Sequence, residues 1–581
     1  MAPTGSAPLG LLLDRGDPLF WWMTLGAQVR WNGQPLPIPG PFALISQLPF
    51  FSGNRYPSRY SVMLMLCVAI LAAVGLAYLL SRRSLSRNIS LSRSLLVLVS
   101  GLFFVEHLAV PMPLSDFRIP ALYERLAAMP GDFTLLELPT GWRNGARVMG
   151  KSDILIMMQQ WYQTAHGKRR LGGNTSRNPL YKFQYFTDAP LIGDLIALMN
   201  ATPSADLNQN ELPRQVEATF DELVARNRGI APTVLDFLGV QYVTVHVEKT
   251  PPLLQRFVAE VLPVTLLEQW QGTDWSGAPA TIDLYAVTPQ PVQPQWSIEL
   301  ATTTSTLYLA EGWATLPWQG VRYATRPCAT LLLDLPTHAG RLTLQLAEPA
   351  TPTSISLNDR PLPFGPTRAP STVTVDFVAD QAAALVDRLT LCAETATPLT
   401  ALANPPNAAG WPIGGTGAAV AADLFVRSAG SDVGNFAQIL RNGAPVMPTA
   451  RGYNLAAFDP AGALLMTATF DTHLTAAAGE ALAAWVAALP ADTIVAGAVM
   501  DEASNALDDG AVQALATLGV AADLRGRFRW SHAFMGVKGA PAGSAVEQLS
   551  LLQPATVTVG VAVDAPTVYL GIRKLDYQMT D

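Results

Sequence analysis

One segment of the chain combines glycines with basic side chains in a pattern that could bind an anion. Gly172 and Gly173 would let backbone N–H groups approach a phosphate, and the basic residues before them could neutralise a pyrophosphate or an acidic glycan. These residues are His166, Lys168, Arg169 and Arg170. Their spacing matches no P-loop, which needs Gly-x-x-x-x-Gly-Lys-Ser/Thr. The alternative is a solvated Gly-rich loop whose basic residues face membrane headgroups or an acidic neighbour.

The remaining histidines and cysteines indicate no further site of chemistry. No two of the six histidines are four residues apart and no cysteines have C-x-x-C spacing, so we expect neither a metal site nor a cofactor. The G-x-S-x-G motif of α/β-hydrolases does not occur in the sequence. Cys328 and Cys392 could form a disulfide in an oxidising compartment if their Cα atoms lie within about 7 Å.

The composition indicates that part of the chain lies in a membrane. Of 581 residues, 49% are hydrophobic and 14% are charged, whereas about 25% of an average soluble chain is charged. Residues 1–112 contain eight arginines and three acidic residues, a net charge of +5, and the remainder carries −12. A basic membrane anchor with an acidic body accounts for this asymmetry, and a nucleic-acid-binding protein does not.

The membrane region, residues 1–112, contains one clear transmembrane segment. Residues 61–80 are uncharged and long enough to cross about 30 Å of hydrocarbon as a helix. The loop 81–94 contains four arginines and no acid, which predicts a cytoplasmic position by the positive-inside rule. These arginines are Arg82, Arg83, Arg87 and Arg93. We also expect a second membrane helix over 95–111 and part of another over 19–29, so that residues from about 113 onward are extracytoplasmic.

Two motifs in the membrane region are similar to a known superfamily. One runs from Leu25-Gly26 through Leu48-Pro49, and the other is Asn54-Arg55-Tyr56-Pro57-Ser58-Arg59-Tyr60 with the Ala-rich helix after it. They resemble the last membrane segments of bacterial multi-pass proteins related to the GT-C glycosyltransferases. Such proteins use a lipid-linked sugar donor and carry acidic catalytic residues in an early extracytoplasmic loop. The resemblance implies a bacterial plasma membrane, but it transfers no activity, because this sequence lacks that loop.

Strand and helix patterns predict two extracytoplasmic domains after the anchor. Residues 113–290 mix strand patterns with helical spacing, which predicts an α/β domain. Residues 291–402 consist of short alternating strands, beginning with Ser305 to Leu309, separated by turn residues. This is typical of an antiparallel β-sandwich and resembles the jelly-roll modules of bacterial surface glycan proteins. A linker rich in Pro, Gly and Ala follows over 403–419.

The last predicted domain, residues 420–575, alternates strands with two helices. Its motifs are R-G-Y-N at 451, F-D-T at 470, D-E-A-S at 501, L-G at 518 and A-F-x-G-x-K-G at 533. In this order they resemble the ILEI domain, the FAM3-type module of the secreted interleukin-like EMT inducer and PANDER-like proteins. The same module forms the stem of a protein O-mannose N-acetylglucosaminyltransferase. The resemblance implies an α/β fold whose function is binding rather than catalysis.

The resemblance also implies a carbohydrate site, because an Asp and an Arg of that glycosyltransferase stem contact the sugar. By motif position they correspond to Asp501 and Arg529, and Trp530 beside them offers a stacking face. A carboxylate at the end of a strand and a guanidinium can form paired hydrogen bonds to vicinal hydroxyls. The alternative is that Asp501 pairs with a backbone amide or with Arg529 only to hold the fold. The sequence departs from the family at His532, where an aromatic residue is expected, and it lacks the cysteines of the secreted relatives.

The sequence therefore predicts a multi-domain protein with an α-helical transmembrane anchor followed by α/β, β-sandwich and ILEI-like domains. We expect non-catalytic binding of a glycan or a surface protein outside the cell, with the lipid bilayer as the other partner. A competing hypothesis is the C-terminal part of a GT-C-like glycosyltransferase without its catalytic N-terminal half. A third is a soluble signalling ligand that proteolysis releases at 403–419.

Overall fold

The computed structural model contains two compact units, Met1–Leu114 and Ser115–Asp581. The residues that it describes are 20–31, 34–48, 57–81, 89–108, 117–144, 147–151, 153–175, 180–202, 210–348, 351–365, 371–382 and 384–580.

The first unit contains one long apolar helix, α3 (Ser61–Ser81), which continues from the short η1 (Pro57–Tyr60). Among the described residues, Ser58–Ser81 form the one helix that is long and apolar enough to cross a membrane. This agrees with the span predicted over 61–80. Most side chains of α3 are exposed and Cys67 is the buried one, as expected for a helix whose surroundings are lipid rather than protein.

The second predicted membrane span, 95–111, differs from the helix that forms. Helix α5 (Ile89–His107) begins earlier and ends sooner, and it is apolar only over Leu96–His107. That stretch rises about 18 Å, which is less than the hydrocarbon thickness of about 30 Å. Of the four arginines expected in the cytoplasmic loop, Arg93 lies in α5 and the other three lie outside the described residues.

The partial membrane helix predicted over 19–29 is also incorrect in its second half. Residues 20–24 are helical, but β1 (Gln28–Trp31) pairs antiparallel with β2 (Gln34–Pro39). Gly26 has a φ of 78°, which is outside the helical range, so the helix ends before residue 28. A short helix, α2 (Phe42–Ile45), follows the hairpin.

The second unit begins with an α/β region, in which helices cover both faces of a five-stranded sheet. The sheet has the order β6-β3-β8-β10-β9, and β3 runs parallel to both of its neighbours. Its strands are β3 (Thr134–Leu138), β6 (Arg169–Leu171), β8 (Val240–His246), β9 (Val264–Thr273) and β10 (Pro279–Val287). A smaller sheet contains β4 (Gly141–Asn144), β5 (Arg147–Gly150) and β7 (Gly173–Thr175).

The two faces of this sheet carry separate hydrophobic cores, which follows from the side-chain alternation along a strand. Leu135 contributes to the core beneath α6 and α7, and Leu136 to the larger core beneath the remaining helices. The helices are α6 (Ala121–Ala128), α7 (Ile154–His166), α8 (Leu180–Asp188), α9 (Ile192–Asn200), α10 (Glu211–Ala218), α11 (Phe220–Arg228), α12 (Ala231–Phe237) and α13 (Pro252–Val261). Helical spacing in the sequence over Asp221 to Arg228 and Val234 to Leu238 predicts α11 and the second half of α12.

Two antiparallel sheets form a β region over 295–402 and 570–579, and their buried residues make one core. One sheet has the order β11-β32-β14-β17, and the other has the order β13-β18-β15-β16. The first contains β11 (Gln295–Glu299), β14 (Gly340–Ala347), β17 (Thr372–Phe377) and β32 (Leu570–Met579), with β12 (Arg322–Ala324) paired to β32. The second contains β13 (Cys328–Leu333), β15 (Ser354–Leu357), β16 (Arg360–Pro361) and β18 (Asp387–Cys392). Cys328 and Cys392 lie opposite each other on β13 and β18 and form a disulfide.

The strand predicted over Ser305 to Leu309 is instead a 3₁₀ helix, η4 (Thr304–Tyr308). The Ser305 hydroxyl donates to the carbonyls of Leu300 and Thr302, and such local bonds compete with strand pairing. Beside it, the guanidinium of the fully buried Arg322 donates to the carbonyls of Leu300, Ala314 and Thr315. Arg322 therefore fixes the irregular segment from inside, which the local sequence pattern could not indicate.

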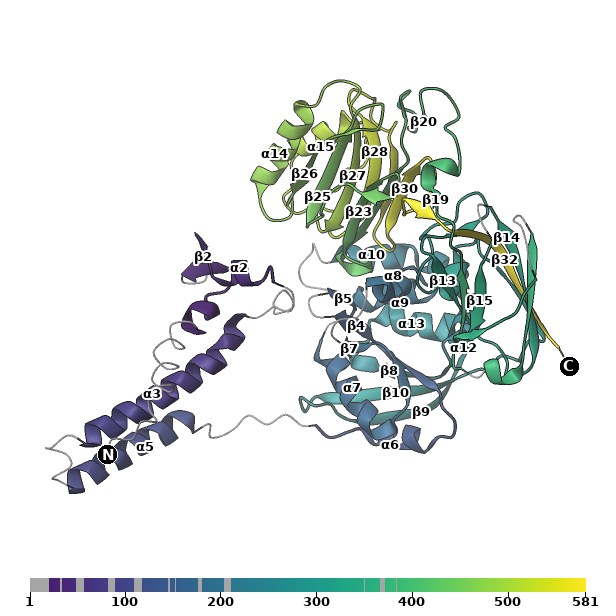
Figure 1. The fold of residues 1–581 in the computed structure, drawn as a ribbon. Coiled ribbons are helices and arrows are strands. Elements are labelled where there is room, and N and C mark those ends of the chain that lie inside the picture. Colours follow the sequence, from purple (N-terminus) through teal and green to yellow (C-terminus); the bar gives the residue numbers. More distant parts are fainter. Residues whose placement is uncertain are drawn as a thin grey trace, which may run out of the picture. The chain divides into compact units, whose positions relative to one another are not determined.

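The last folded region is an α/β domain over 411–563, built on a nine-stranded mixed sheet. Helices α14 (Ala476–Ala487) and α15 (Asp509–Ala516) pack on one face (Figure 1). Asp508 caps α15 by accepting a hydrogen bond from the Ala511 N–H. The strands are β22 (Leu424–Gly430), β23 (Phe436–Arg441), β24 (Ala444–Pro445), β25 (Gly452–Phe458), β26 (Leu464–Phe470), β27 (Ile494–Asp501), β28 (Ser531–Val537), β29 (Val546–Ser550) and β30 (Ala555–Val559). The sequence predicts these helices from about Thr475 to Leu489 and from Asp508 or Asp509 to a stop at Gly519, and the limits agree to within about three residues.

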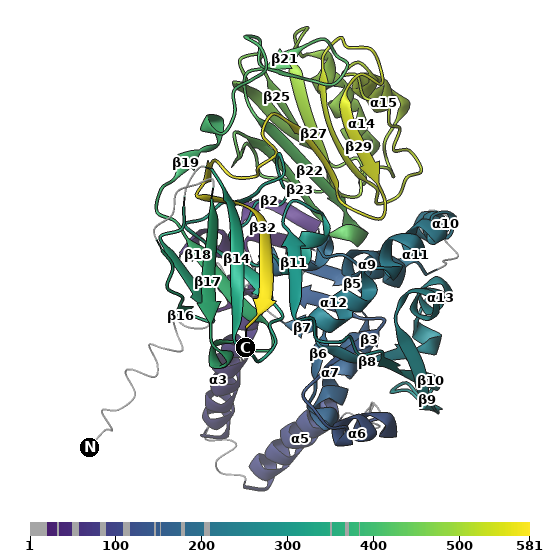
Figure 2. The ribbon, with the colours of Figure 1, turned by 90° about the vertical axis from the view of Figure 1, so that its right-hand side faces the viewer.

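This domain is inserted into the β region rather than appended to it. Strand β19 (Thr397–Pro398) leads into the domain and pairs with β31 (Thr567–Val568), which leads out. The chain then returns as β32 to a position between β11 and β14 (Figure 2). The predicted domain limit at residue 575 therefore lies within a strand of the β region, and a single cut between 403 and 419 would leave that strand in its sheet.

The predicted linker 403–419 is partly structured. Strands β20 (Trp411–Pro412) and β21 (Ala419–Val420) pair as a hairpin, and Ile413 is fully buried in the core of the inserted domain. Residues 411–419 thus belong to the domain, because their apolar side chains cover the sheet face opposite α14 and α15.

Candidate functional site

Asp501 and Arg529 lie together at one end of the inserted sheet. Strands β22 and β27 run parallel there, with Gly430 opposite Asp501, and Arg529 precedes β28. A Cβ atom on Gly430 would lie 1.8 Å from the Arg529 carbonyl oxygen, so only glycine permits the close approach of these two backbones. The carboxyl ends of parallel strands are a usual place for ligand sites in α/β sheets.

Both candidate residues have a backbone conformation that L-amino acids rarely adopt. The φ angle is 64° at Asp501 and 62° at Arg529. A non-glycine residue at such an angle costs of order 1 kcal/mol, and such strain concentrates at functional sites. Two strained residues at the same strand ends are therefore an observation that favours a function here.

The Arg529 guanidinium pairs with Asp432 rather than with Asp501. Its Nη1 lies 3.0 Å from Asp432 Oδ1, in η7 (Ser431–Val433) just after β22. Burial raises the pKa of Asp432, Arg529 counteracts this, and the neighbouring Asp501 raises that pKa further. Among the described residues, the Asp501 carboxylate has no hydrogen-bond or ion-pair partner, so the pairings considered for Asp501 from the sequence are not formed.

Asp432 lies on the side of the inserted domain that faces the α/β region. The ammonium of Lys151, which follows β5, also lowers the pKa of Asp432. Helix η7 packs against α9 and β5. The site is thus formed by the inserted domain at the surface that it presents to the α/β region, and Arg529 keeps 40% of its side-chain surface exposed.

Trp530 is partly buried at the boundary between the inserted domain and the α/β region. Its ring packs against the larger core of the α/β region, and its Nε1 is buried without a hydrogen-bond partner among the described residues. The guanidinium of Arg527 lies over the ring, 5.0 Å from its centroid. Trp530 therefore contributes to the contact between the two regions.

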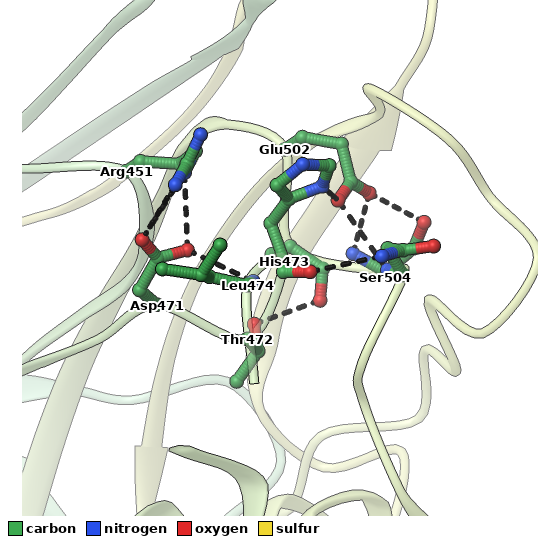
Figure 3. A network of polar contacts seen from close by, with 9 residues as sticks. Arg451, Asp471, Thr472, His473, Leu474, Glu502 and Ser504 are labelled. Carbon is green, nitrogen blue, oxygen red and sulfur yellow. Dashed lines mark hydrogen bonds and ion pairs between the residues drawn. The ribbon is translucent and has the colours of Figure 1, made fainter. Parts of the chain in front are cut away.

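The motif residues around 451, 470 and 501 form a second polar network, shown in Figure 3. Arg451 contacts Asp471 with two nitrogens, Nε at 3.0 Å and Nη2 at 2.9 Å. The Glu502 carboxylate lies 2.5 Å from His473 Nδ1 and accepts hydrogen bonds from the backbone N–H and hydroxyl of Ser504. The network joins the loop after β26 to the loop after β27, so these motifs stabilise the fold.

This network has the residue types of a nucleophilic triad but not its geometry. The Ser504 hydroxyl donates to Glu502 at 2.5 Å, and within the described residues it forms no hydrogen bond to His473. A serine nucleophile needs a histidine base within hydrogen-bond reach. The described residues also contain no group of three or more His, Cys, Asp or Glu side chains that could hold a metal ion.

His532, which departs from the family pattern, is fully buried between two polar partners. Its Nδ1 lies 3.1 Å from the Tyr453 hydroxyl, and its Nε2 lies 2.8 Å from Glu547. Burial would raise the pKa of Glu547, but His532 and the N–H groups of Ala521 and Ala522 lower it overall. A purely apolar ring at this position would leave the carboxylate and the hydroxyl without these hydrogen bonds.

Three basic side chains of the segment predicted to bind an anion, Lys168, Arg169 and Arg170, already have hydrogen-bond partners within the α/β region. Lys168 Nζ donates to the carbonyls of Met129 and Gly131, each at 2.9 Å. Arg169 pairs with Asp132 at 2.5 Å. The acidic neighbour considered as the alternative is therefore present.

Arg170 belongs to a buried network that also contains His246. Its Nε lies 2.6 Å from Glu137 Oε2, with 3% and 0% of the two side chains exposed. The Tyr123 hydroxyl donates to the other oxygen of Glu137 at 3.0 Å and lies 3.1 Å from His246 Nε2. Burial, together with Arg170 and Lys168, lowers the pKa of His166 to about 4. These residues hold the sheet to α6 and α7.

The inserted domain is thus an α/β module in which polar motif residues hold together the loops at one end of the sheet. Residues 451–540 match the family model described as interleukin-like EMT inducer, and the chain contains an ILEI domain. No curated protein is significantly similar to the chain. The resemblance of the membrane region to GT-C-related proteins lies outside this match and stays a prediction.

Proposed function

We propose that the protein is anchored in a membrane by α3 and binds a carbohydrate through Asp501 and Arg529 of its ILEI domain. The observation that carries this proposal is the Asp501 carboxylate, which occupies a strained backbone position and has no partner among the described residues. Beside it, Arg529 uses Nη1 on Asp432 and remains partly exposed. The Asp501 carboxylate can accept a hydrogen bond from one hydroxyl of a sugar while the Arg529 guanidinium donates to the neighbouring hydroxyl.

The disulfide supports an extracytoplasmic position for the body of the protein. Cys328 and Cys392 join two strands of one sheet, and disulfides persist mainly in oxidising compartments. The arginine-rich segment after α3 favours the same topology by the positive-inside rule. Both arguments support a position of the ILEI domain outside the plasma membrane, where it would meet extracellular or periplasmic glycans.

The test is a glycan array probed with the purified full-length protein and with Asp501→Gly, a substitution that removes the carboxylate but suits the positive φ angle. We expect loss of glycan binding with the fold intact. A conservative second variant, Arg529→Lys, keeps the charge but loses the planar donor geometry and should also weaken binding. The matched control is Asp492→Gly, because Asp492 is an exposed ILEI-domain aspartate with nearly the same φ, 62°.

Binding that persists in both site variants would contradict the proposal, as would equal loss in Asp492→Gly. Thermal unfolding of each variant, followed by circular dichroism, shows whether a loss of binding reflects loss of the fold.

A further inference from the structure

A cleft of about 440 Å³ lies between the α/β region and the β region, away from the ILEI domain. Its walls come from α12, from the connection 290–293, from β11 and η4, and from the end of β13. A volume in this range accommodates a small organic ligand.

The described residues that line the cleft include two carboxylates and no basic side chain. Asp236 comes from α12, and Asp334 follows β13. Neither carboxylate has a hydrogen-bond or ion-pair partner among the described residues, whereas the deeper Asp387 accepts hydrogen bonds from Asn358 and from the Leu335 N–H. The cleft therefore presents two negative charges that the surrounding protein does not neutralise.

Partial removal from water and the repulsion of Asp236 and Asp387 raise the pKa of Asp334 to about 6. Partial removal from water raises the pKa of Asp236 as well, and both residues remain exposed at the surface of the cleft. Tyr308, from η4, is the other titratable group facing Asp334, and its pKa is raised by burial and by that carboxylate. These shifts are what an acidic cleft without a cation produces.

Three aromatic side chains complete the lining. Trp296 is held by Tyr577, with ring centroids 5.0 Å apart and planes 30° apart. Tyr308 and Phe237 meet edge to face at 5.2 Å. These contacts fix the rings before a ligand arrives, and the electron-rich faces of aromatic rings attract cations.

We propose that this cleft binds an organic ammonium ion, held by the carboxylates of Asp236 and Asp334 and by the rings of Trp296 and Tyr308. An anion would be repelled, and a neutral ligand would leave both carboxylates uncompensated. A calcium ion takes six to eight oxygen ligands, more than two carboxylates supply. This site shares no residue with the proposed carbohydrate site, so each proposal can fail independently.

The test compares choline with its neutral isostere 3,3-dimethylbutan-1-ol by isothermal titration calorimetry on the full-length protein in detergent. We expect choline to bind and the alcohol to bind at least about tenfold more weakly, because only the ammonium gains the charge interactions. The double substitution Asp236→Asn with Asp334→Asn should weaken choline binding by about tenfold or more. Asp380→Asn, at an exposed aspartate of the same region that pairs with Arg360, should leave it unchanged.

A second arm uses pH. Choline stabilises the ionised form of Asp334, so its affinity should rise between pH 5 and pH 7.5, and binding near pH 6 should release protons. Asp334→Asn should remove most of this pH dependence. Trp296→Leu should weaken choline binding but leave its pH dependence in place.

Equal affinity for the neutral isostere, choline binding unaffected by the double substitution, or no binding of choline at millimolar concentration would each overturn the proposal. Calcium that competes with choline more strongly than tetramethylammonium would also overturn it, because the site would then be a metal site.

Discussion

The basic segment at 166–170 and the strand ends at 501 and 529 differ in how the protein treats their charges. In the first, Lys168, Arg169 and Arg170 all donate to carbonyl or carboxylate oxygens of the α/β region. In the second, Arg529 has one partner and Asp501 has none among the described residues. A cluster of charges in a sequence therefore indicates a ligand site only when the fold leaves part of that charge uncompensated.

The largest difference in stability between the basic segment and the strand-end site is expected from a substitution at Arg170. Arg170→Met leaves the fully buried Glu137 without its counter-charge, and breaking one side of a buried pair costs about 3–5 kcal/mol. The double variant Arg170→Met with Glu137→Met should recover most of this loss. Chemical denaturation measures both. The control Arg169→Met breaks a more exposed pair and should cost less than about 1 kcal/mol; an equal cost at both arginines would show that burial is not decisive.

Low pH should destabilise the α/β region through two buried histidines. Burial, with smaller charge effects, lowers the pKa of both His166 and His246 to about 4, below the unfolded value of about 6.5. Their neutral forms are favoured in the fold, so their contribution is complete above pH 6.5 and is lost as the pH falls towards 4. Each histidine contributes of order 3 kcal/mol over that window. His246→Gln should reduce the slope of stability against pH between 6.5 and 4, and an unchanged slope would contradict the assignment.

An intermediate effect is expected at His532, which lies in the ILEI domain but has partners at both ring nitrogens. His532→Phe supplies the aromatic ring expected from the family but removes the partner of the Tyr453 hydroxyl and one of the hydrogen-bond partners of Glu547, which keeps the Ala521 and Ala522 N–H groups. Leaving buried polar groups unpaired costs about 1–3 kcal/mol. Thermal unfolding measures the change, and glycan binding should persist once the variant is folded. Stabilisation by Phe would mean that the hydrogen bonds contribute less than the added apolar contact.

The sequence predicted elements well where local periodicity determines them, as for α11 and α14. It could not predict the partner of β32, because an alternating pattern shows that residues 570–579 form a strand but not that the strand pairs with β11 and β14. Motif position located Asp501 and Arg529. Asp432, the actual partner of Arg529, lies in a short 3₁₀ turn without a motif, and its role depends on the approach of distant backbones at Gly430.

The smallest effect concerns the strain at the ILEI site. Asp501→Gly should stabilise the domain by about 0.5–1 kcal/mol, because glycine adopts a φ of 64° without the Cβ penalty. It also removes the repulsion that raises the pKa of Asp432, so that pKa should fall, which NMR titration of the labelled carboxyl can follow. Asp492→Gly should give a similar gain in stability without the change at Asp432. If both variants gain stability but only Asp501→Gly loses glycan binding, the strained carboxylate of Asp501 serves the ligand and not the fold. A loss of stability in Asp501→Gly would instead assign the carboxylate to the fold and place this site with the neutralised segment at 166–170.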